Sequence, residues 1–523
     1  MAASLATRAL RNMVALPDEP KRAPNPAGNV YLVGAGPGNP DLLTLRAHEL
    51  LQHADLILYD NLASPEVLEH ARPAAQRRYV GKKRAEHACT QAEINDLMVA
   101  AARDGKVVVR LKGGDPYVFG RGGEEALGLV RAGVPFEVVP GVTSALGAAA
   151  YGGMPLTHRD HTQAVTFVTG HDVDQIDWKS LAGRQTLVVF MGLLSMHEIA
   201  RRLIGGGLSP DTPAAAIRWV TRGDQRVVTA SIADLPLAIQ REGLRPPALV
   251  VVGDIVALRD EIDWFDKLPL RGQSVVVTRA AAQAAPFCGR LRRLGARVIP
   301  IPAISFEPPS SWAPADKAIA MLPSYDWAIF TSVNGVEHFL ERLDASASDL
   351  RHLPKRIAAI GSATADRLRE LHLKVELIPD KFVAEAMVEA FRERDVDGRR
   401  VLLPRAEEAR SLLPDQLAKM GAEIDVVPVY RTVVPEASRA LAEQAWSADP
   451  VPDWVTFTSS STARMLAQLV PLDRLRRSKV ASIGPVTSAT VRELGLPVEV
   501  EARRFTAEGI ADVLCISVAN AIR

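Results

Sequence analysis

Short apolar runs alternate with amphipathic stretches along most of the chain. In the first half, the runs typical of strands are Val30–Val33, Leu56–Tyr59, Tyr79–Val80, Val107–Leu111, Phe136–Val139, Val165–Thr169, Leu187–Met191 and Ala248–Val252. Helical periodicity lies between them. After the first run, Asn39 or Asp41 is expected to cap a helix with four apolar residues on one face: Leu43, Ala47, Leu50 and Leu51. Strands that alternate with helices predict the α/β class.

The second half of the chain repeats itself. Residues 272–304 parallel 398–430, residues 330–340 parallel 457–467, and residues 357–387 parallel 480–510. Such a duplication predicts two similar α/β lobes, in which strands end in short Ser/Thr/Gly loops that open helices. Loops of this kind, such as Thr331-Ser332 and Thr458-Ser459-Ser460, either cap their helices or attract an anion through hydroxyls and N–H groups.

The glycine-rich stretch Arg110–Glu125 follows an apolar run and carries five glycines. Glycine lets a backbone approach a ligand closely, and open α/β sheets bind ligands beyond the carboxyl ends of their strands. The earlier loop Gly34–Gly38 lacks the third glycine of a dinucleotide fingerprint, so it is weak evidence for a nicotinamide cofactor. Asp60 follows another strand and either points into a ligand crevice or caps the next turn. The cationic turn Gly81–Arg84 is typical of solvated surface.

Composition limits the classes of function. A chain of 523 residues predicts three or four domains, and the segment 263–272 suggests a boundary near Leu268–Arg271. A net charge of +1 and 5% aromatic residues argue against nucleic acid as a partner. No apolar run is long enough to span a membrane, and the first 28 residues are expected to form a disordered extension. We therefore expect a soluble protein.

Cysteine and histidine usage predicts no metal site. The three cysteines are far apart and form no CxxC motif, which excludes a disulfide scaffold or a cysteine zinc site and favours a reducing cytoplasm. His158, His161 and His171 lack the spacing of helical metal ligands.

The segment Val30–Phe265 resembles the uroporphyrinogen-III C-methyltransferases of the tetrapyrrole methylase family. The resemblance rests on VGAGPGNPDLLTL, LILYDNL, YVGKK, VRLKGGDPYVFGRGGEE, PGVTSA, GMPLTHRD and VVFMG, which occur in the family's order. It implies a two-lobed α/β domain over residues 29–268 that binds S-adenosylmethionine and methylates uroporphyrinogen III twice to give precorrin-2. It also implies a homodimer formed through this domain. No dehydrogenase or ferrochelatase domain precedes it, so sirohaem completion is expected to need another protein.

The same resemblance implies individual site residues. Asp60 matches the family's proposed proton acceptor and Lys82 its proposed proton donor. The residues implied to bind the methyl donor are Pro37, Gly113, Gly114, Asp115, Val118, Thr143, Ser144, Met191 and Val220. Asp115 is expected to accept hydrogen bonds from a ribose or amine. The chain departs from the family at Trp219-Val220, where many relatives have Asn-Gly.

Residues 269–523 resemble uroporphyrinogen-III synthases, through TSxNGV, the AIG loop and VPVYRT. The resemblance implies that hydroxymethylbilane is closed with inversion of its last ring and loss of water, without a cofactor. Tyr430, at the end of an apolar strand, is implied to assist departure of the hydroxyl. It further implies one lobe from about 271–305 plus 431–523 and another from about 306–430. The residues expected to bind substrate are Arg279, Thr331, Ser332, Ser362, Arg405, Thr458, Ser459 and Ser460.

Together these observations predict a cytoplasmic bifunctional enzyme that closes hydroxymethylbilane and then methylates the product. Both tetrapyrroles carry many carboxylates, so cationic side chains are expected to face both sites: Lys82, Arg110, Arg279, Arg405 and Arg431. Direct passage of the intermediate is a further hypothesis. The alternatives are a methylase of a later corrin intermediate, a second half that only binds a tetrapyrrole as a regulatory module, and an interaction scaffold.

Overall fold

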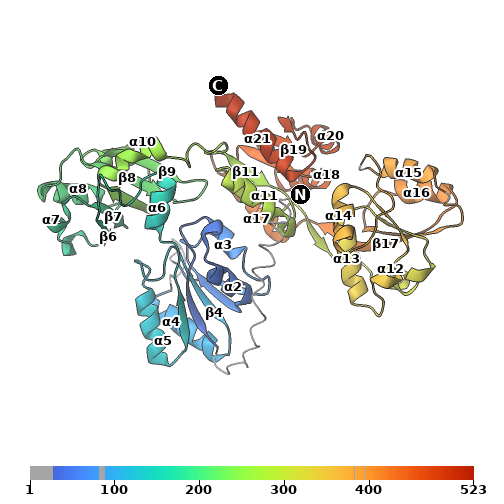
Figure 1. Ribbon diagram of the computed structural model, residues 1–523, viewed down its shortest axis with the longest axis horizontal. Coiled ribbons are helices and arrows are strands. Elements are labelled where there is room, and N and C mark those ends of the chain that lie inside the picture. The colour runs from blue at the N-terminus through green and yellow to red at the C-terminus, as the bar shows by residue number, and fades with distance from the viewer. Residues whose placement is uncertain (1–27, 82–88, 382, 395, 523) are drawn as a thin grey trace. The chain divides into compact units, whose positions relative to one another are not determined.

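The computed structural model describes residues 28–81, 89–381, 383–394 and 396–522 (Figure 1). Residues 1–27 of the expected extension and Lys82 therefore lie outside the described residues. The chain divides into two compact units. The first comprises Met1–Gly272 with Leu294–Arg297, and the second comprises Gln273–Arg293 with Val298–Arg523.

The first unit begins with a five-stranded parallel sheet in the order β3-β2-β4-β1-β5. Its strands are β1 (Val30–Gly34), β2 (Leu56–Tyr59), β3 (Gln76–Tyr79), β4 (Val108–Lys112) and β5 (Phe136–Val139). Helices α2 (Leu45–His53) and α3 (Pro65–Leu68) pack on one face, and α4 (Gln91–Arg103) and α5 (Gly122–Ala132) pack on the other. Because β1 pairs with β4, the loops that follow these two strands leave the same edge side by side.

The second sheet of this unit is mixed and has the order β6-β7-β10-β8-β9. Only β6 and β7 run parallel. Its strands are β6 (Val165–Thr169), β7 (Thr186–Phe190), β8 (Pro213–Arg218), β9 (Arg226–Ser231) and β10 (Ala248–Val252). Helices α8 (Met196–Gly205), α9 (Leu235–Arg241) and short α7 (Trp178–Leu181) cover one face. Helix α6 (Ser144–Gly152), which follows β5 of the first sheet, packs on the other face and so joins the two sheets. Short α10 (Arg259–Ile262) follows β10.

The second unit contains two lobes. The first has the sheet order β12-β11-β18-β19-β20, made of β11 (Ser274–Val277), β12 (Arg297–Pro300), β18 (Trp454–Phe457), β19 (Lys479–Ser482) and β20 (Val500–Glu501). Its helices are α11 (Ala281–Arg293), α17 (Glu436–Ser447), α18 (Ser460–Leu469), α19 (Leu472–Leu475), α20 (Pro485–Glu493) and α21 (Ala507–Ile522).

The other lobe has the sheet order β13-β17-β16-β14-β15, made of β13 (Ser305–Glu307), β14 (Trp327–Phe330), β15 (Arg356–Ala359), β16 (Arg400–Ala406) and β17 (Glu423–Val433). Its helices are α12 (Ala313–Ala320), α13 (Val333–Asp344), α14 (Ser362–Glu370), α15 (Ala384–Arg392) and α16 (Leu412–Lys419). Strands β13 and β17 are antiparallel, with Ser305 opposite Val433. The chain enters this lobe through β13 and leaves it through β17.

Isolated 3-10 turns complete the described elements: η1 (Pro40–Leu42), η2 (Val173–Gln175), η3 (Asp254–Leu258), η4 (Leu322–Ser324) and η5 (Leu350–His352). The α/β class expected from the sequence is confirmed. The helix cap expected at Asn39 or Asp41 is wrong, because Asn39 caps η1 and Leu43 is extended. Helix α2 starts later, where Thr44 Oγ1 accepts a hydrogen bond from the backbone N–H of Ala47 at 3.1 Å.

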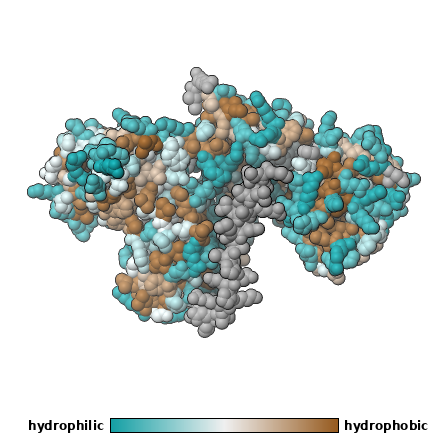
Figure 2. All heavy atoms as spheres, viewed as in Figure 1, coloured by the Kyte–Doolittle hydropathy of each residue, from teal (hydrophilic) through white to brown (hydrophobic). Residues whose placement is uncertain are grey.

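None of the helices in the described ranges is long and apolar enough to cross a membrane. Figure 2 shows hydrophilic residues interspersed with apolar ones over the visible face.

Candidate active sites

A hollow in the first unit lies where the two sheets meet. It contains about 710 Å³ of space outside protein atoms, part of it open to solvent. Its lining comes from the loops after β1, β2, β4, β7 and β8, the start of α6, and the start of β10. The lining residues are Gly36, Pro37, Gly38, Leu62, Gly113, Gly114, Ser144, Phe190, Met191, Ile217, Trp219, Val220, Arg222, Pro247, Ala248 and Leu249.

Glycines allow main-chain segments to meet at this hollow. Gly114 has φ +67° and exchanges backbone hydrogen bonds with Gly36, at 2.8 and 3.2 Å. A Cβ on Gly141 would lie 2.2 Å from the Gly114 carbonyl oxygen, and a Cβ on Gly113 would lie 2.5 Å from Cβ of Leu62. Backbone groups therefore form a wall of the hollow that only glycine can provide.

Two further lining residues, Met191 and Trp219, and the buried Thr221 beside them have left-handed backbone conformations. Met191, Trp219 and Thr221 have φ of +54°, +49° and +66°. Thr221 is held on both sides, because its Oγ1 accepts from the backbone N–H of Asn39 at 2.9 Å and its own N–H donates to Gln225 Oε1 at 2.8 Å. Backbone strain of this kind occurs at ligand sites whose surroundings enforce it.

The nine residues expected to bind the methyl donor divide into two groups. Six line the hollow: Pro37, Gly113, Gly114, Ser144, Met191 and Val220. The other three lie next to it: Asp115, Val118 and Thr143. Val118 packs against the apolar cluster under the hollow, and Thr143 is buried before the first residue of α6.

Asp115 is engaged with its own loop. Its Oδ1 accepts from the N–H of Tyr117 at 2.8 Å, and its Oδ2 accepts from the N–H of Gly141 at 3.0 Å. The carboxylate therefore holds the Gly113–Gly114 loop against the start of the α6 segment.

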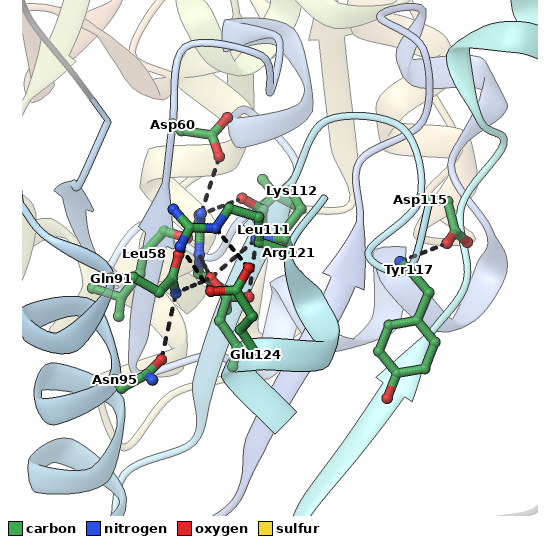
Figure 3. A network of polar contacts seen from close by, with 12 residues as sticks. Leu58, Asp60, Gln91, Asn95, Leu111, Lys112, Asp115, Tyr117, Arg121 and Glu124 are labelled. Atoms are coloured by element: carbon green, nitrogen blue, oxygen red, sulfur yellow. Dashed lines mark hydrogen bonds and ion pairs between the residues drawn. The ribbon is translucent and has the colours of Figure 1, made fainter. Parts of the chain in front are cut away.

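A buried ionic network lies beside the hollow (Figure 3). Glu125 is fully buried and contacts two cations, Arg110 Nε at 3.0 Å and Lys112 Nζ at 2.9 Å. Arg110 also contacts Asp60 Oδ2 at 3.1 Å. Burial, reinforced by repulsion from Arg110, lowers the pKa of the Lys112 ammonium, while Glu125 opposes this shift. Gln91 of α4 donates a further hydrogen bond to Glu125.

This network changes the role of Arg110. The sequence predicts a cation facing substrate, but the side chain is buried and paired with two carboxylates. It orients Asp60, whose Oδ1 also accepts from the N–H of Leu62, a residue of the hollow, at 3.0 Å. The expected partner of Asp60, Lys82, lies outside the described residues.

In the second unit, Tyr430 lies inside strand β17 rather than at its end. Its ring is buried between Phe306 and His338, with ring centroids 5.3 and 5.4 Å away. Its hydroxyl lies 3.3 Å from Ser332 Oγ. Burial raises the pKa of Tyr430, against the opposing effects of Ser332, Asn334 and Arg405. The phenol is therefore a donor at neutral pH.

The remaining residues expected to bind hydroxymethylbilane lie at strand ends of both lobes. Ser332 and Ser459 cap α13 and α18 by accepting from the N–H groups of Gly335 and Thr462. Ser362 is the first residue of α14, and Ser460 is the first residue of α18. Thr331 and Thr458 precede the capping serines.

Of the two repeat-related arginines, Arg405 is buried and Arg279 is half-buried. Burial lowers the pKa of both Arg279 and Arg405, and Arg405 donates to the carbonyl oxygen of Arg410 at 2.6 Å. Arg431 differs, because it is exposed and paired with Glu307 at 2.7 Å. The structure thus brings Tyr430, Ser332 and Arg405 into one cluster.

Sequence reasoning missed several residues of both sites. Glu125 and Lys112 lie in the glycine-rich stretch but were not predicted as site residues. Asn334 belongs to the TSxNGV motif and His338 to the repeated segment 330–340, and neither was predicted as a site residue. The internal repeat carries a signal for these residues, because they differ between the two copies. The counterparts of Asn334, His338 and Tyr430 in the other lobe are Ser461, Met465 and Ile304.

Two family models match the chain. Residues 29–236 match the tetrapyrrole (corrin/porphyrin) methylases, and residues 286–512 match uroporphyrinogen-III synthase HemD. The porphyrin biosynthesis protein HemD of Ruminiclostridium josui is 34% identical over 499 residues, covering 93% of this chain and 97% of that protein.

Other matches cover about half of the chain. The siroheme synthase of Chromobacterium violaceum is 54% identical over 243 residues, which are 46% of this chain and 52% of that protein. The chain thus spans about half the length of the siroheme synthases it matches. A solved uroporphyrin-III C-methyltransferase of Thermus thermophilus, in complex with S-adenosylhomocysteine, is 44% identical, with 44% of this chain and all of that chain covered and a TM-score of 0.39.

Proposed function

The chain belongs to the family of the porphyrin biosynthesis protein HemD of Ruminiclostridium josui, and from this premise we propose that it is a bifunctional enzyme of tetrapyrrole biosynthesis. The second unit closes hydroxymethylbilane to uroporphyrinogen III with inversion of the last ring. The first unit methylates that product twice from S-adenosylmethionine to give precorrin-2. The observation that carries the proposal is a glycine-walled hollow beside an oriented carboxylate in one unit, and a buried tyrosine hydroxyl in the other.

The hollow of the first unit fits the methyl donor. Gly113 has no room for a Cβ, and Gly36 and Gly114 have φ of +72° and +67°, so all three offer main-chain groups that other residues would not, while Met191 and Val220 supply apolar contact. S-Adenosylmethionine supplies an activated methyl group, so the larger task of the protein is to hold the ring carbon in line with it.

Methylation of a ring carbon requires a proton to leave afterwards. Asp60 is the proposed acceptor, because Arg110 and the Leu62 N–H orient its two oxygens. Lys82 is the proposed donor, as the family resemblance implies.

In the second unit, Tyr430 donates a hydrogen bond to the departing hydroxyl of hydroxymethylbilane. Its burial keeps the phenol protonated, and Ser332 Oγ lies 3.3 Å from its oxygen. Arg405, Arg279 and the serine and threonine loops bind the carboxylates, because Arg405 holds positive charge near Tyr430 and Arg279 lies at the equivalent position of the other lobe.

The homodimer formed through the first unit and the cytoplasmic location remain proposals. Both come from the family resemblance, and the three free cysteines fit a reducing compartment. Fusion of the two activities raises the effective concentration of the intermediate if the geometry allows.

The test is an anaerobic incubation of the full chain with hydroxymethylbilane and S-adenosylmethionine, followed by product mass and isomer analysis. A dimethylated type-III tetrapyrrole is expected. If methylation needs added uroporphyrinogen III, the second unit is a binding module. If the type-III product stays unmethylated, the substrate of the first unit is a different tetrapyrrole.

A matched variant separates the two activities. Tyr430→Phe keeps the ring between Phe306 and His338 but removes the hydroxyl. We expect roughly a 100-fold fall in type-III formation, the lower range for loss of an acid catalyst, with methylation of added uroporphyrinogen III unchanged. Equal loss of both activities would contradict the assignment.

A further inference from the structure

One wall of the hollow in the first unit is a turn made of residues 219–225, here called the wall turn. Trp219, Val220 and Arg222 of this turn line the hollow. Within it, the Arg222 N–H donates to the Trp219 carbonyl oxygen at 3.2 Å, and the Gln225 N–H donates to that of Arg222 at 3.0 Å. Because Trp219 has a left-handed backbone, with φ +49°, the wall turn keeps its shape only where surrounding contacts enforce it.

Arg271 supplies such contacts from outside the wall turn. Its Nη1 donates to the carbonyl oxygen of Gly223 at 2.7 Å, and its Nη2 donates to the carbonyl oxygen of Gln225. Its Nε donates to Oδ1 of Asp266 at 2.6 Å, and its guanidinium carbon lies 4.9 Å from the centroid of the buried Phe265 ring. The arginine side chain is only 14% exposed, so water competes little with these hydrogen bonds.

The two carbonyl groups lie two residues apart in the wall turn, and one planar guanidinium bridges them. A guanidinium is a rigid fork of donors, so it fixes the spacing of the two groups that it holds. Gln225 carries this constraint further, because its Oε1 accepts from the N–H of Thr221 at 2.8 Å. Thr221 Oγ1 in turn accepts from the N–H of Asn39, in the loop after β1, at 2.9 Å. The constraint therefore reaches both sides of the hollow.

A second segment packs on the same turn. Leu294–Arg297, which follow α11, belong to the first unit, and the Leu270 N–H donates to the Leu294 carbonyl oxygen at 2.8 Å. A Cβ on Gly223 would lie 2.4 Å from the carbonyl oxygen of Ala296. Both this segment and Arg271 lie beyond residue 236, where the match to the tetrapyrrole methylases ends. The wall turn thus depends on parts of the chain outside the matched segment.

We propose that Arg271 is a positioning residue for S-adenosylmethionine, which holds the wall turn in the shape that binds the methyl donor. The inference rests on the proposed function of the first unit and deepens it. Arg271 itself is not a lining residue of the hollow. Without its contacts the wall turn has to order when the donor binds, so the apparent Kd rises by the inverse of the fraction of chains already in the binding shape. The bound donor then restores the wall, and the transfer step changes little.

The decisive variant is Arg271→Gln in the full chain, because a glutamine cannot bridge both carbonyl groups. Isothermal titration with S-adenosylmethionine is expected to give a Kd about tenfold higher, the effect of a wall that is preformed in about one tenth of the chains. In methylation of added uroporphyrinogen III, KM for the donor is expected to rise by the same factor, with kcat within about twofold. Arg241→Gln, on α9 with a side chain 78% exposed, removes the same charge and is expected to change neither constant.

Arg271→Lys supplies a second measurement in a variant that keeps the charge opposite Asp266. Its single nitrogen cannot hold both carbonyl groups as a fork does. The Kd is therefore expected to lie between those of the unsubstituted chain and Arg271→Gln. The binding stoichiometry reports the fraction of folded chain in each sample, which a purely structural role would lower without changing Kd.

An unchanged Kd in Arg271→Gln would overturn the inference, as would loss of folded chain in both variants, which would make Arg271 a residue of the fold alone. Full affinity in Arg271→Lys would assign the effect to charge and overturn the role of the fork. In each case the unsubstituted chain still binds S-adenosylmethionine, so the proposed function survives. If the unsubstituted chain binds none, the proposed function of the first unit fails and this inference fails with it.

Discussion

Glu125 is fully buried and is the shared partner of two cations, Arg110 and Lys112. A buried carboxylate of this kind compensates charges that could not otherwise leave water. Glu124, the preceding residue, is exposed and pairs with exposed Arg121 at 2.7 Å. Comparing variants of these two glutamates therefore separates the effect of a buried ion pair on stability from that of an exposed one.

Glu125→Gln is expected to destabilise the first unit by about 3 kcal/mol, because it leaves a buried cation uncompensated. For a domain of this size, that corresponds to a fall in melting temperature on the order of 10 °C. Differential scanning calorimetry of the full chain measures it. Glu124→Gln is the control and is expected to leave the transition unchanged, since an exposed pair is screened by solvent. Similar losses in both variants would contradict the role given to the buried network.

The titration of Tyr430 makes a prediction at alkaline pH. Burial raises its folded-state pKa above the ordinary value of 10.0. The neutral phenol therefore contributes stability that is fully present below pH 10.0 and is lost as the pH rises through the folded-state value. The groups that face it from neighbouring elements are Arg405, Glu408 and His338.

Urea unfolding of the full chain and of Tyr430→Phe at a series of pH values measures this contribution. The stability difference between the two is expected to stay constant up to about pH 10 and then to move in favour of the phenylalanine variant. A constant difference above that pH would show that the tyrosine titrates normally.

At the scale of elements, the segment between β5 and α6 is tightly packed and leaves no space for a larger side chain at Gly141. Gly141 donates its N–H to Asp115 and lies against the carbonyl oxygen of Gly114. Gly123, at the start of α5, instead has open space where its Cβ would be.

Gly141→Ala is therefore expected to abolish S-adenosylmethionine binding, because the added Cβ would push the Gly113–Gly114 loop out of place. Isothermal titration of the full chain with S-adenosylmethionine measures the loss. Gly123→Ala should bind normally and be more stable by up to about 1 kcal/mol, since alanine favours a helix. Normal binding by Gly141→Ala would mean that the glycine wall does not hold the methyl donor.

Several elements could be read from the sequence because their signal is local. Strands β2, β5, β6 and β10 have the bounds that their apolar runs predict. Strand β8 was missed because its core, Ala214–Ala216, lacks β-branched residues and is stabilised by pairing with β9 and β10.

Part of each candidate site could be predicted from the sequence because its signal is also local. Glycine loops and the tyrosine of the VPVYRT motif stand out in the sequence. The left-handed conformations of Met191 and Trp219, and the burial of Arg110 with Glu125, depend on contacts between distant segments. No local pattern encodes them.

At the scale of the whole molecule, the two units have separate apolar cores. The cores of the two sheets in the first unit and of the two lobes in the second are built from different residues. A ligand that binds one unit is therefore expected to stabilise that unit by its own binding free energy.

Calorimetry of the full chain should show this as a selective shift. S-Adenosylmethionine at about 100 times its Kd is expected to stabilise the transition of the first unit by about 2.7 kcal/mol. The transition of the second unit should stay in place, and Gly141→Ala should abolish the shift. A common shift of both transitions would mean that the units unfold together.

The order of strands in the second unit has a consequence for synthesis on the ribosome. Strands β11 and β12 emerge early, but their sheet gains β18, β19 and β20 only after the whole of the other lobe has been made. At roughly 5–20 residues per second, the roughly 150 residues between β12 and β18 take about 10–30 s. Until then β11 exposes an unpaired edge, whereas the inserted lobe receives all its strands, β13 to β17, in one continuous run. Substitutions in the late strands should therefore appear first as insoluble nascent protein.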